Sequence, residues 1–508
     1  MKLPHRLALL LSMSLAACGG GGGNNGASGN EGGVVTAPVP PVTLRGSLID
    51  PTALVPQTAA GATVNTLTPA ALSALLNAAQ SGSTVITGNP TCSVTVYRAH
   101  YHTIGSAAEN TDASTAIMVP SGADPSCSGP RPVLLYAHGT SVLKTTDMAD
   151  LGGTEARLIA AIFASQGYIV VAPNYAGLAG SALPYLPYLD VAQESSDMVD
   201  GLRAARASFA AIGAADSGQL YVTGYSQGGH VALATQRAMQ LSYPAEFRVA
   251  AAAGLSGPYA LSLFGDTIFD GAPTIGSAAF VPLLINTGQR AGARIYSATG
   301  DIYEDKYATG IDTLFPSTVG IGDLVAAGKL PDDVLFAADS LPQSPGYAAH
   351  FGADHLIKSA YRAAYLADMQ AHPCGTSNSA PLACAPAQPL RQWLLKNDLR
   401  NYTPNVPLLL CGGKDDPIVP FVNADAATAY FSAQGKAAYT LTELNIDATS
   451  IGNLYSSEQL AFQAAKLAVR ANAIAAGDDP NQAVQGSYHA GLVAPFCLRS
   501  ARDFFKTF

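Results

Sequence analysis

Residues 219–241 read QLYVTGYSQGGHVALATQRAMQL. The apolar run Leu220–Val222 predicts a short buried strand, and the Ala-, Leu- and Gln-rich end of the stretch predicts a helix. Between the two, Gly224 and Gly228 flank Ser226 two residues away on either side. Because small residues let the backbones crowd together there, the stretch predicts a sharp strand-to-helix turn that exposes the serine side chain.

The Gly-x-Ser-x-Gly pattern takes its meaning from this context. In a chain with 50 glycines among 508 residues, the letters alone can arise by chance. A strand before the pattern, a helix after it and a further Gly229 for close packing are typical of a nucleophile elbow, in which a strained turn presents a serine for attack. The alternative is an ordinary glycine-rich turn between a strand and a helix.

The N-terminus has the pattern of a bacterial export signal. Basic residues precede the apolar run Leu7–Leu15, which is too short to span a bilayer. The run ends in Leu-Ala-Ala-Cys18, which resembles a bacterial lipobox. We therefore expect residues 1–18 to be a lipoprotein signal peptide and Cys18 to carry the lipid anchor. The alternative is a freely secreted protein that is cleaved near Ala17.

Composition limits the organisation and the partners of the remaining chain. Residues 19–45 are rich in Gly, then in Val and Pro, and we expect a flexible tether there. The rest is longer than a typical single-core domain, which suggests one core with a large insertion. The net charge is −9 and basic residues do not cluster, so nucleic acid is not an expected partner.

Six cysteines follow Cys18. An even number in an exported chain favours disulfides, although six cysteines allow many connectivities. No Cys-x-x-Cys pair occurs, which argues against a zinc site. We expect three pairs: Cys92 with Cys127, Cys374 with Cys384, and Cys411 with Cys497.

Strand and helix patterns alternate through most of the chain. The expected strands cover residues 93–102, 115–120, 132–137, 168–172, 220–222, 249–255, 406–411 and 438–446. The expected helices cover residues 153–166, 191–212, 230–241, 422–434 and 456–476, the last with Leu460, Leu467 and Ile474 at heptad spacing, before a short closing helix that ends at 505. This alternation predicts an α/β fold with a mostly parallel sheet that is covered on both faces.

Residues 260–395 interrupt the alternation. They combine scattered Gly and Pro with many aromatic residues and short helical patterns. We interpret them as a cap that is inserted over the site between two core segments, 46–259 and 396–508. The alternative is an irregular region that packs elsewhere.

A serine nucleophile needs a base within hydrogen-bond reach and an acid that orients the base. Of nine histidines, His489 alone follows the resumed sheet pattern, in a Gly- and Ser-flanked stretch that we interpret as a loop. The acid should follow the strand that ends at Cys411, where Asp415 and Asp416 are adjacent. The phrase Asp-x-x-Val-Pro starts at Asp416 and favours it, with Asp415 as the alternative.

The tetrahedral intermediate of acyl transfer needs two backbone N–H donors. The first should belong to Gln227, directly after Ser226. The second should come from the loop after the strand 132–137, where we choose Thr140 and keep Gly139 as the close alternative.

Five segments carry a family resemblance: Tyr136-Ala-His-Gly-Thr140, Pro173-Asn-Tyr-Ala-Gly177, Gly224-Tyr-Ser-Gln-Gly228, Asp416-Pro-Ile-Val-Pro420 and His489. Together they resemble the α/β-hydrolase superfamily and, within it, the secretory lipase family of fungal A-type lipases and their bacterial relatives. The resemblance implies hydrolysis of carboxylic esters through a serine acyl-enzyme, with neither a metal nor an organic cofactor. The expected cap has no lipid-specific motif, so the choice between lipase and esterase stays open, as does the oligomeric state.

The leading hypothesis is therefore a serine esterase or lipase whose catalytic residues are Ser226, Asp416 and His489. Its substrate would be a lipid, a short-chain ester or a polyester. We expect an exported lipoprotein in the periplasm, at the outer membrane or on the cell surface. Two alternatives are a peptidase or amidase on the same fold and a non-catalytic surface-binding lipoprotein.

Overall fold

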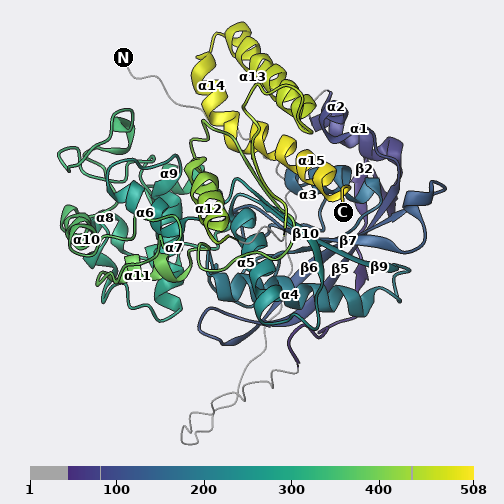
Figure 1. The fold of residues 1–508 in the computed structure, drawn as a ribbon, viewed down its shortest axis with the longest axis horizontal. Helices are drawn as coiled ribbons and strands as arrows, with labels where there is room; N and C mark the ends of the chain where they lie inside the picture. The colour runs from purple at the N-terminus through teal and green to yellow at the C-terminus, as the bar shows by residue number, and fades with distance from the viewer. Residues whose placement is uncertain (1–43, 80–81, 436–438) are drawn as a thin grey trace, which may run out of the picture.

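A ten-stranded mixed sheet lies at the centre of the protein, and helices cover both of its faces (Figure 1). The computed structural model describes residues 44–79, 82–435 and 439–508. The strand order is β1-β5-β6-β8-β7-β9-β10-β11-β12, with β4 beside β5. The strands from β8 to β12 run parallel, whereas β6 pairs antiparallel with both β5 and β8. The predicted α/β fold with a mostly parallel sheet is confirmed.

The central strands are short and deeply buried, as expected for Val-, Leu- and Ala-rich runs that are covered on both faces. A separate two-stranded sheet pairs β2 with β3. The strands are β1 (Ala53–Leu54), β2 (Gln57–Ala59), β3 (Ala62–Val64), β4 (Thr66–Leu67), β5 (Ser93–Ile104), β6 (Asn110–Ser121), β7 (Arg131–Ala137), β8 (Ile169–Pro173), β9 (Asp216–Tyr225), β10 (Val249–Leu255), β11 (Leu408–Gly412) and β12 (Leu441–Asn445).

Helices of the core divide between the two faces of the sheet. Side chains of α4, α5 and α12 pack on one face, and side chains of α3, α13 and α15 pack on the other. The core helices are α1 (Pro69–Ala79), α2 (Ser83–Thr87), α3 (Thr154–Ile162), α4 (Val191–Ser208), α5 (Gln227–Leu241), α12 (Val422–Ala433), α13 (Ser456–Ala476), α14 (Pro480–Ser487) and α15 (Ala494–Phe505). Within the described residues, no helix is both long enough and apolar enough to cross a bilayer.

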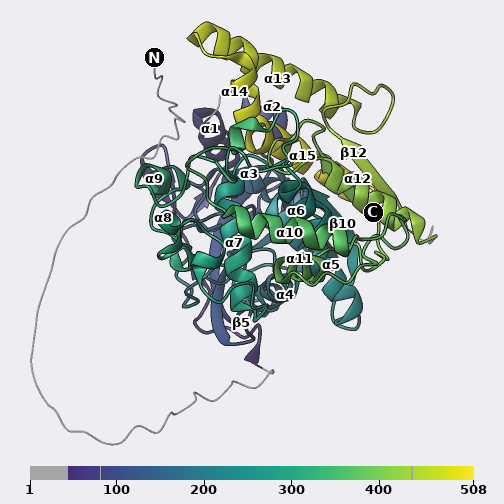
Figure 2. The same ribbon diagram turned by 90° about the vertical axis from the view of Figure 1, so that its left-hand side faces the viewer.

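The segment between β10 and β11 forms a helical lobe beside the sheet, to the left in Figure 1 and in front in Figure 2. Its helices pack around a hydrophobic cluster of their own, with Phe269, Phe336, Tyr365 and Trp393 among its buried members. They are α6 (Leu261–Phe269), α7 (Ser277–Arg290), α8 (Asp305–Ala308), α9 (Ile321–Ala326), α10 (Ser359–Ala371) and α11 (Pro389–Lys396).

Three disulfides join the predicted partners and confirm the expected pairs: Cys92–Cys127, Cys374–Cys384 and Cys411–Cys497. The third links the end of β11 to α15. The expected signal peptide, Cys18 and most of the expected tether lie outside the described residues. Arg45, at the end of that expected tether, pairs with Asp200 of α4 at 3.0 Å.

Helix α13 has the predicted bounds, but its heptad residues do not face the core. Leu460, Leu467 and Ile474 are 73%, 65% and 65% exposed. Phe462 is instead the buried aromatic anchor of this helix. The heptad spacing therefore identified the helix without identifying the face that is buried.

Candidate active site

Ser226 lies on a sharp turn between β9 and α5. Its backbone has φ 59° and ψ −124°, an unusual conformation for a residue with a side chain. The two glycines of the pattern allow this turn. A Cβ atom on Gly228 would lie 1.9 Å from the Ala137 carbonyl oxygen, and one on Gly224 would lie 2.2 Å from the Gly228 carbonyl oxygen. Any side chain at either position would collide with backbone atoms.

The structure brings Ser226, His489 and Asp416 together. The His489 Nε2 atom lies 2.9 Å from the Ser226 hydroxyl, and its Nδ1 atom lies 2.7 Å from the Asp416 carboxylate. A proton on Nδ1 that is donated to Asp416 leaves Nε2 free to accept the serine proton. The backbone N–H groups of Ile418 and Val419 donate to the other Asp416 oxygen and hold this carboxylate in place.

The two adjacent acids have different environments. Asp416 is buried against His489, whereas the Asp415 side chain is 68% exposed. The nearest basic group to Asp415 is Lys466, at 3.8 Å. Of the two residues that the sequence left open, the preferred Asp416 is the one that contacts the histidine.

His489 does not lie in a loop, so that part of the prediction is wrong. It belongs to a π-helical turn (Tyr488–Val493) that joins α14 directly to α15. The Gly and Ser residues that suggested a loop fall at the end of α14 and within the turn. Single π-turns inside helices are rare and often occur at functional sites.

Tyr225, which the sequence analysis did not select, supports the histidine. Its hydroxyl donates to the His489 carbonyl oxygen, and the two rings lie 4.9 Å apart. The residue before the serine therefore positions the backbone that carries the imidazole. Its place directly before Ser226 is the one signal in the sequence that could have identified it.

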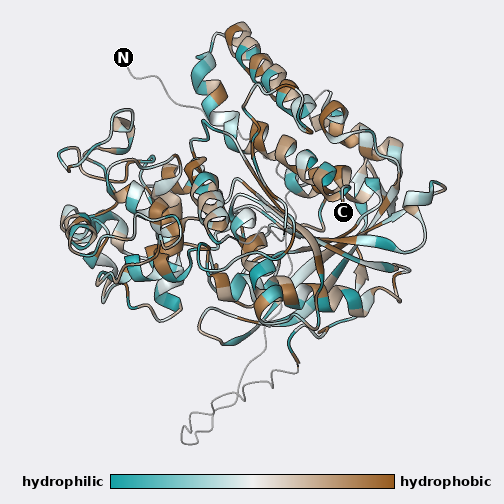
Figure 3. Cartoon of the chain, viewed as in Figure 1, coloured by the Kyte–Doolittle hydropathy of each residue, from teal (hydrophilic) through white to brown (hydrophobic). Residues whose placement is uncertain are grey.

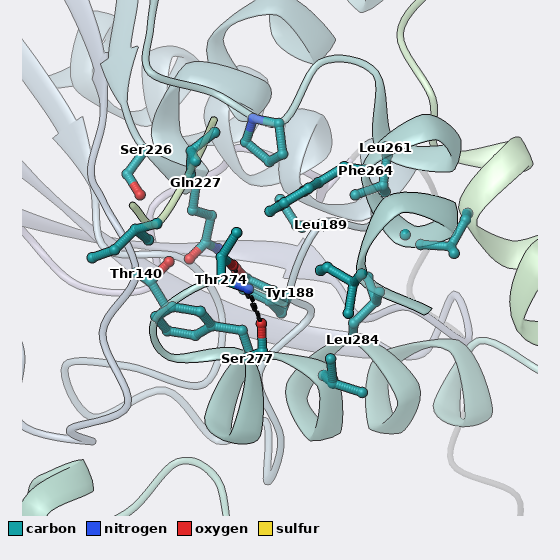
Figure 4. A pocket seen from close by; sticks show the side chains of 18 residues that line it. Thr140, Tyr188, Leu189, Ser226, Gln227, Leu261, Phe264, Thr274, Ser277 and Leu284 are labelled. Carbon is teal, nitrogen blue, oxygen red and sulfur yellow. Dashed lines mark hydrogen bonds between the residues drawn. The ribbon is translucent and has the colours of Figure 1, made fainter. Parts of the chain in front are cut away.

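The two candidate oxyanion donors of the loop after β7 also differ. The Gly139 N–H donates to the Glu155 carboxylate at 2.9 Å, and the Tyr136 hydroxyl donates to the same oxygen. No described residue accepts a hydrogen bond from the Thr140 N–H. Thr140 lines the same pocket as Ser226 and Gln227, and the N–H of Gln227 is the first of α5 (Figure 4).

Known structures and families resemble this chain. Residues 155–255, which include Ser226, match the prolyl oligopeptidase family. A ligand-bound form of the rice cell wall degrading esterase LipA from Xanthomonas oryzae is 26% identical, with a TM-score of 0.67 over 90% of this chain and 98% of that chain. Another LipA structure is 28% identical, with a TM-score of 0.64 over 82% and 94% of the two chains. The chain is an α/β-hydrolase.

A putative hydrolase from Legionella pneumophila shares the fold of this α/β-hydrolase at 20% identity, with a TM-score of 0.63 over 89% of this chain and 97% of that chain. Among curated proteins, no match to the present chain was found. The esterases among its relatives agree with the resemblance that the sequence suggested. The comparisons thus support a hydrolase. Which residue is the nucleophile, and which bond is hydrolysed, must be argued from the arrangement of the site residues.

Glu194 of α4 contacts the turn that carries Ser226 in this α/β-hydrolase. It is fully buried and accepts a hydrogen bond from the Gln227 side-chain amide. Burial raises the pKa of Glu194 well above its usual value, which favours the uncharged form of this carboxyl next to the site. The sequence carried a signal for it that we did not use: Asp190, Glu194 and Asp197 recur every three to four residues along a predicted helix.

A largely apolar pocket opens beside Ser226 (Figure 4). It encloses about 590 Å³ of space including its mouth. Thr140 and Gln227 lie at one end with the serine, and helices α6 and α7 form much of the wall. The apolar side chains of those two helices in the wall are Leu261, Phe264, Ile268, Phe280, Val281 and Leu284.

The lobe between β10 and β11 is also hydrogen-bonded to the loop that carries Thr140. The Ser317 N–H donates to the Val142 carbonyl oxygen at 2.7 Å, and the Lys144 N–H donates to the Ser317 carbonyl oxygen at 2.8 Å. The lobe therefore contacts the site at two places, the pocket wall and this loop.

Proposed function

We propose that this α/β-hydrolase is a serine carboxylic-ester hydrolase that works through an acyl-enzyme. The observation that carries the proposal is the continuous hydrogen-bonded series Asp416–His489–Ser226 at the edge of an apolar pocket. The esterase relatives support the same class of reaction.

In the first half of the reaction, His489 Nε2 takes the proton of the Ser226 hydroxyl while the serine oxygen attacks the ester carbonyl carbon. The N–H groups of Gln227 and Thr140 bind the oxygen that becomes negative, and each such donor typically contributes ~10² to 10³ to kcat. The protonated His489 then gives its proton to the leaving alcohol, and the acyl group remains on Ser226.

In the second half, water replaces the alcohol. His489 takes a proton from the water, the hydroxide attacks the acyl carbon, and the acid leaves as Ser226 regains its proton. Asp416 accepts the His489 Nδ1 hydrogen bond and stabilises the imidazolium form of His489. The raised pKa of Glu194 suits this site, because a second charged carboxylate close to the oxyanion donors would oppose the negative charge that develops there.

The substrate class follows from the pocket. Its apolar wall favours the hydrocarbon part of an acyl group, and we propose that residues 260–395 act as a cap that supplies this wall. Candidate substrates are a lipid, a short-chain ester or a polyester. Because the similar LipA is described as a cell wall degrading esterase, a polymer-bound ester belongs in the same tests.

A second candidate is cleavage of amides, because residues 155–255 match the prolyl oligopeptidase family. We test both with p-nitrophenyl esters from short to long acyl chains and with p-nitroanilides, on the unaltered protein and on Ser226→Ala. We expect ester hydrolysis that falls by at least ~10³ in the variant. Anilide hydrolysis at a rate comparable with that of esters would favour the amidase, and undiminished turnover by Ser226→Ala would exclude Ser226 as the nucleophile.

We further propose that the protein is exported and anchored to a membrane through a lipid on Cys18. The lipobox-like Leu-Ala-Ala-Cys18 supports the anchor, and the three disulfides support an oxidising compartment.

A further inference from the structure

Helix α13 carries apolar side chains on its outer face as well as on the face that packs against the core. Its inner face combines apolar packing with polar contacts. Phe462, Ala465 and Val469 pack against the core cluster, while Gln459 donates to the Asn445 carbonyl oxygen, Gln463 donates to Asp447, and Lys466 pairs with Asp447 at 2.6 Å. Phe462 is the one large apolar side chain that this helix buries. A surface helix of a soluble protein ordinarily buries its apolar stripe and exposes its polar side chains.

The outer face of α13 carries an apolar stripe, which consists of Leu460, Ala464, Leu467, Ala471 and Ile474. All five residues are exposed. Their spacing of four, three, four and three residues is the strict heptad of a helix–helix seam, narrower than the face by which a helix packs on a globular core. This spacing indicates that the missing partner is another helix.

The stripe also stands out from the rest of the surface. Ile451 and Leu454, just before the helix, are 97% and 62% exposed. Of the fifteen exposed large hydrophobic side chains in the described residues, five lie within residues 451–474. Figure 1 shows α13 at the outer edge of the molecule, and Figure 3 shows hydrophobic residues recurring along it. Clustered apolar exposure of this kind marks an interaction surface.

We propose that the stripe is a self-association surface, on which α13 of a second copy of the chain packs antiparallel. Large and small residues alternate along it. In an antiparallel pair, Leu460 of one copy faces Ala471 of the other and Leu467 faces Ala464, so that each large side chain meets a small one. A parallel pair would instead oppose Ala with Ala and leave gaps. A twofold axis perpendicular to the two helices generates this antiparallel arrangement.

Charge is compatible with this close approach. Arg470 is the one charged residue among the exposed positions of α13. In the register that pairs Leu467 with Ala464, the two copies of Arg470 lie about 13 Å apart along the helix axis. No like charges therefore oppose each other at the seam.

The size of the surface sets the expected strength. Stable interfaces usually bury about 1,000 Å² or more in total, and a helix of 21 residues is about 31 Å long. The stripe together with Ile451 and Leu454 offers seven exposed apolar side chains along that length. We therefore expect a dimer with a dissociation constant in the micromolar range.

The test is sedimentation velocity of the full chain at concentrations from ~1 to 100 μM. We expect the sedimentation coefficient to rise with concentration, and Leu467→Lys to raise the dissociation constant by at least about tenfold. The matched control is Leu241→Lys, since Leu241 is another exposed leucine, 57% exposed at the end of α5 and outside the stripe. The control should associate like the unaltered chain, and all three proteins should unfold at the same temperature.

Because the apolar run Leu7–Leu15 can itself cause association, the comparison between variants decides the outcome. Association that Leu467→Lys leaves unchanged, or that Leu241→Lys weakens equally, would overturn the proposal. A chain that stays monomeric would also overturn it. If that monomer floats with phosphatidylethanolamine–phosphatidylglycerol vesicles and Leu467→Lys abolishes the flotation, the stripe is a membrane-docking surface instead.

Discussion

Asp415 and Asp416 are neighbours in the chain, yet their surroundings differ completely. Asp416 is buried and contacts His489, while Asp415 faces solvent near Lys466. A single sequence places both residues at the right turn, but the choice depends on which side chain points inward. That direction follows from the hydrogen bonds that Ile418 and Val419 make to Asp416.

Exchange of each acid for its amide separates their roles. We expect Asp416→Asn to lower kcat for a p-nitrophenyl ester by ~10³ to 10⁴, because an amide no longer holds the His489 tautomer that accepts the serine proton. Asp415→Asn should stay within about twofold, since it changes an exposed charge. Steady-state kinetics of both variants provide the measurement. Equal losses in the two variants would contradict the assignment of the acid.

Glu194 offers a second prediction at the level of one residue. In Glu194→Gln, the amide oxygen can accept the same hydrogen bond from Gln227, so we expect kcat and its pH profile to change little. Glu194→Ala leaves the buried Gln227 amide without a partner, and we expect kcat to fall by about tenfold with KM nearly constant. An equal loss of kcat in Glu194→Gln would mean that the carboxylic acid proton itself is needed.

At the level of elements, the sequence predicted most helices and strands, but it did not predict which of their polar side chains are buried. The expected helix 191–212 is α4, which ends at Ser208. Its acidic residues Glu194, Asp197 and Asp200 are all buried, as is Asp190 directly before it, although such residues normally face solvent. Their burial depends on partners from distant segments, which one helical pattern cannot reveal.

Asp197 links α4 to the pH dependence of stability. Burial raises its pKa from 3.8 to about 7, and one of its oxygens accepts hydrogen bonds from the Ala176 N–H and the Gln193 amide. Between pH ~4 and ~7 the folded state keeps a proton on this carboxyl that the unfolded state has lost, so this residue's contribution to the free energy of unfolding falls as pH rises.

Asp197→Asn removes that dependence while its amide oxygen can accept the same two hydrogen bonds. We expect the stability of the variant, relative to the unaltered protein, to increase from pH ~4 to ~7 and to level off above pH ~7. Urea unfolding at a series of pH values measures the difference. A constant difference across this range would show that Asp197 titrates alike in the folded and unfolded chains.

The π-helical turn at His489 could not be predicted from the local sequence. Its Gly and Ser residues are typical of a loop, and nothing in the six residues themselves specifies a wider helical turn. Packing against Tyr225 and the continuation into α15 define its shape. The position of His489 in the chain was enough to identify it as the base. Its backbone conformation could not be predicted in the same way.

At the level of the whole molecule, the anchor proposed for Cys18 is directly testable. We expect the unaltered protein to sediment with membranes and to incorporate labelled palmitate in a bacterial host, whereas Cys18→Ala should do neither. Ser14→Ala, a change within the same signal segment, should behave like the unaltered protein. Labelling that persists in Cys18→Ala would place the lipid elsewhere, and a soluble, unlabelled parent protein would favour free secretion.

The helical lobe also determines the order in which the sheet can be completed. Strand β10 pairs on one side with β9, which precedes it, and on the other side with β11, which follows 152 residues later. During synthesis, the emerging chain therefore has an open Ala-rich strand edge until the whole lobe has been made. Such an edge can pair with another chain. The sheet is thus completed, and Asp416 brought toward the serine, only after the last residues of the lobe have been synthesised.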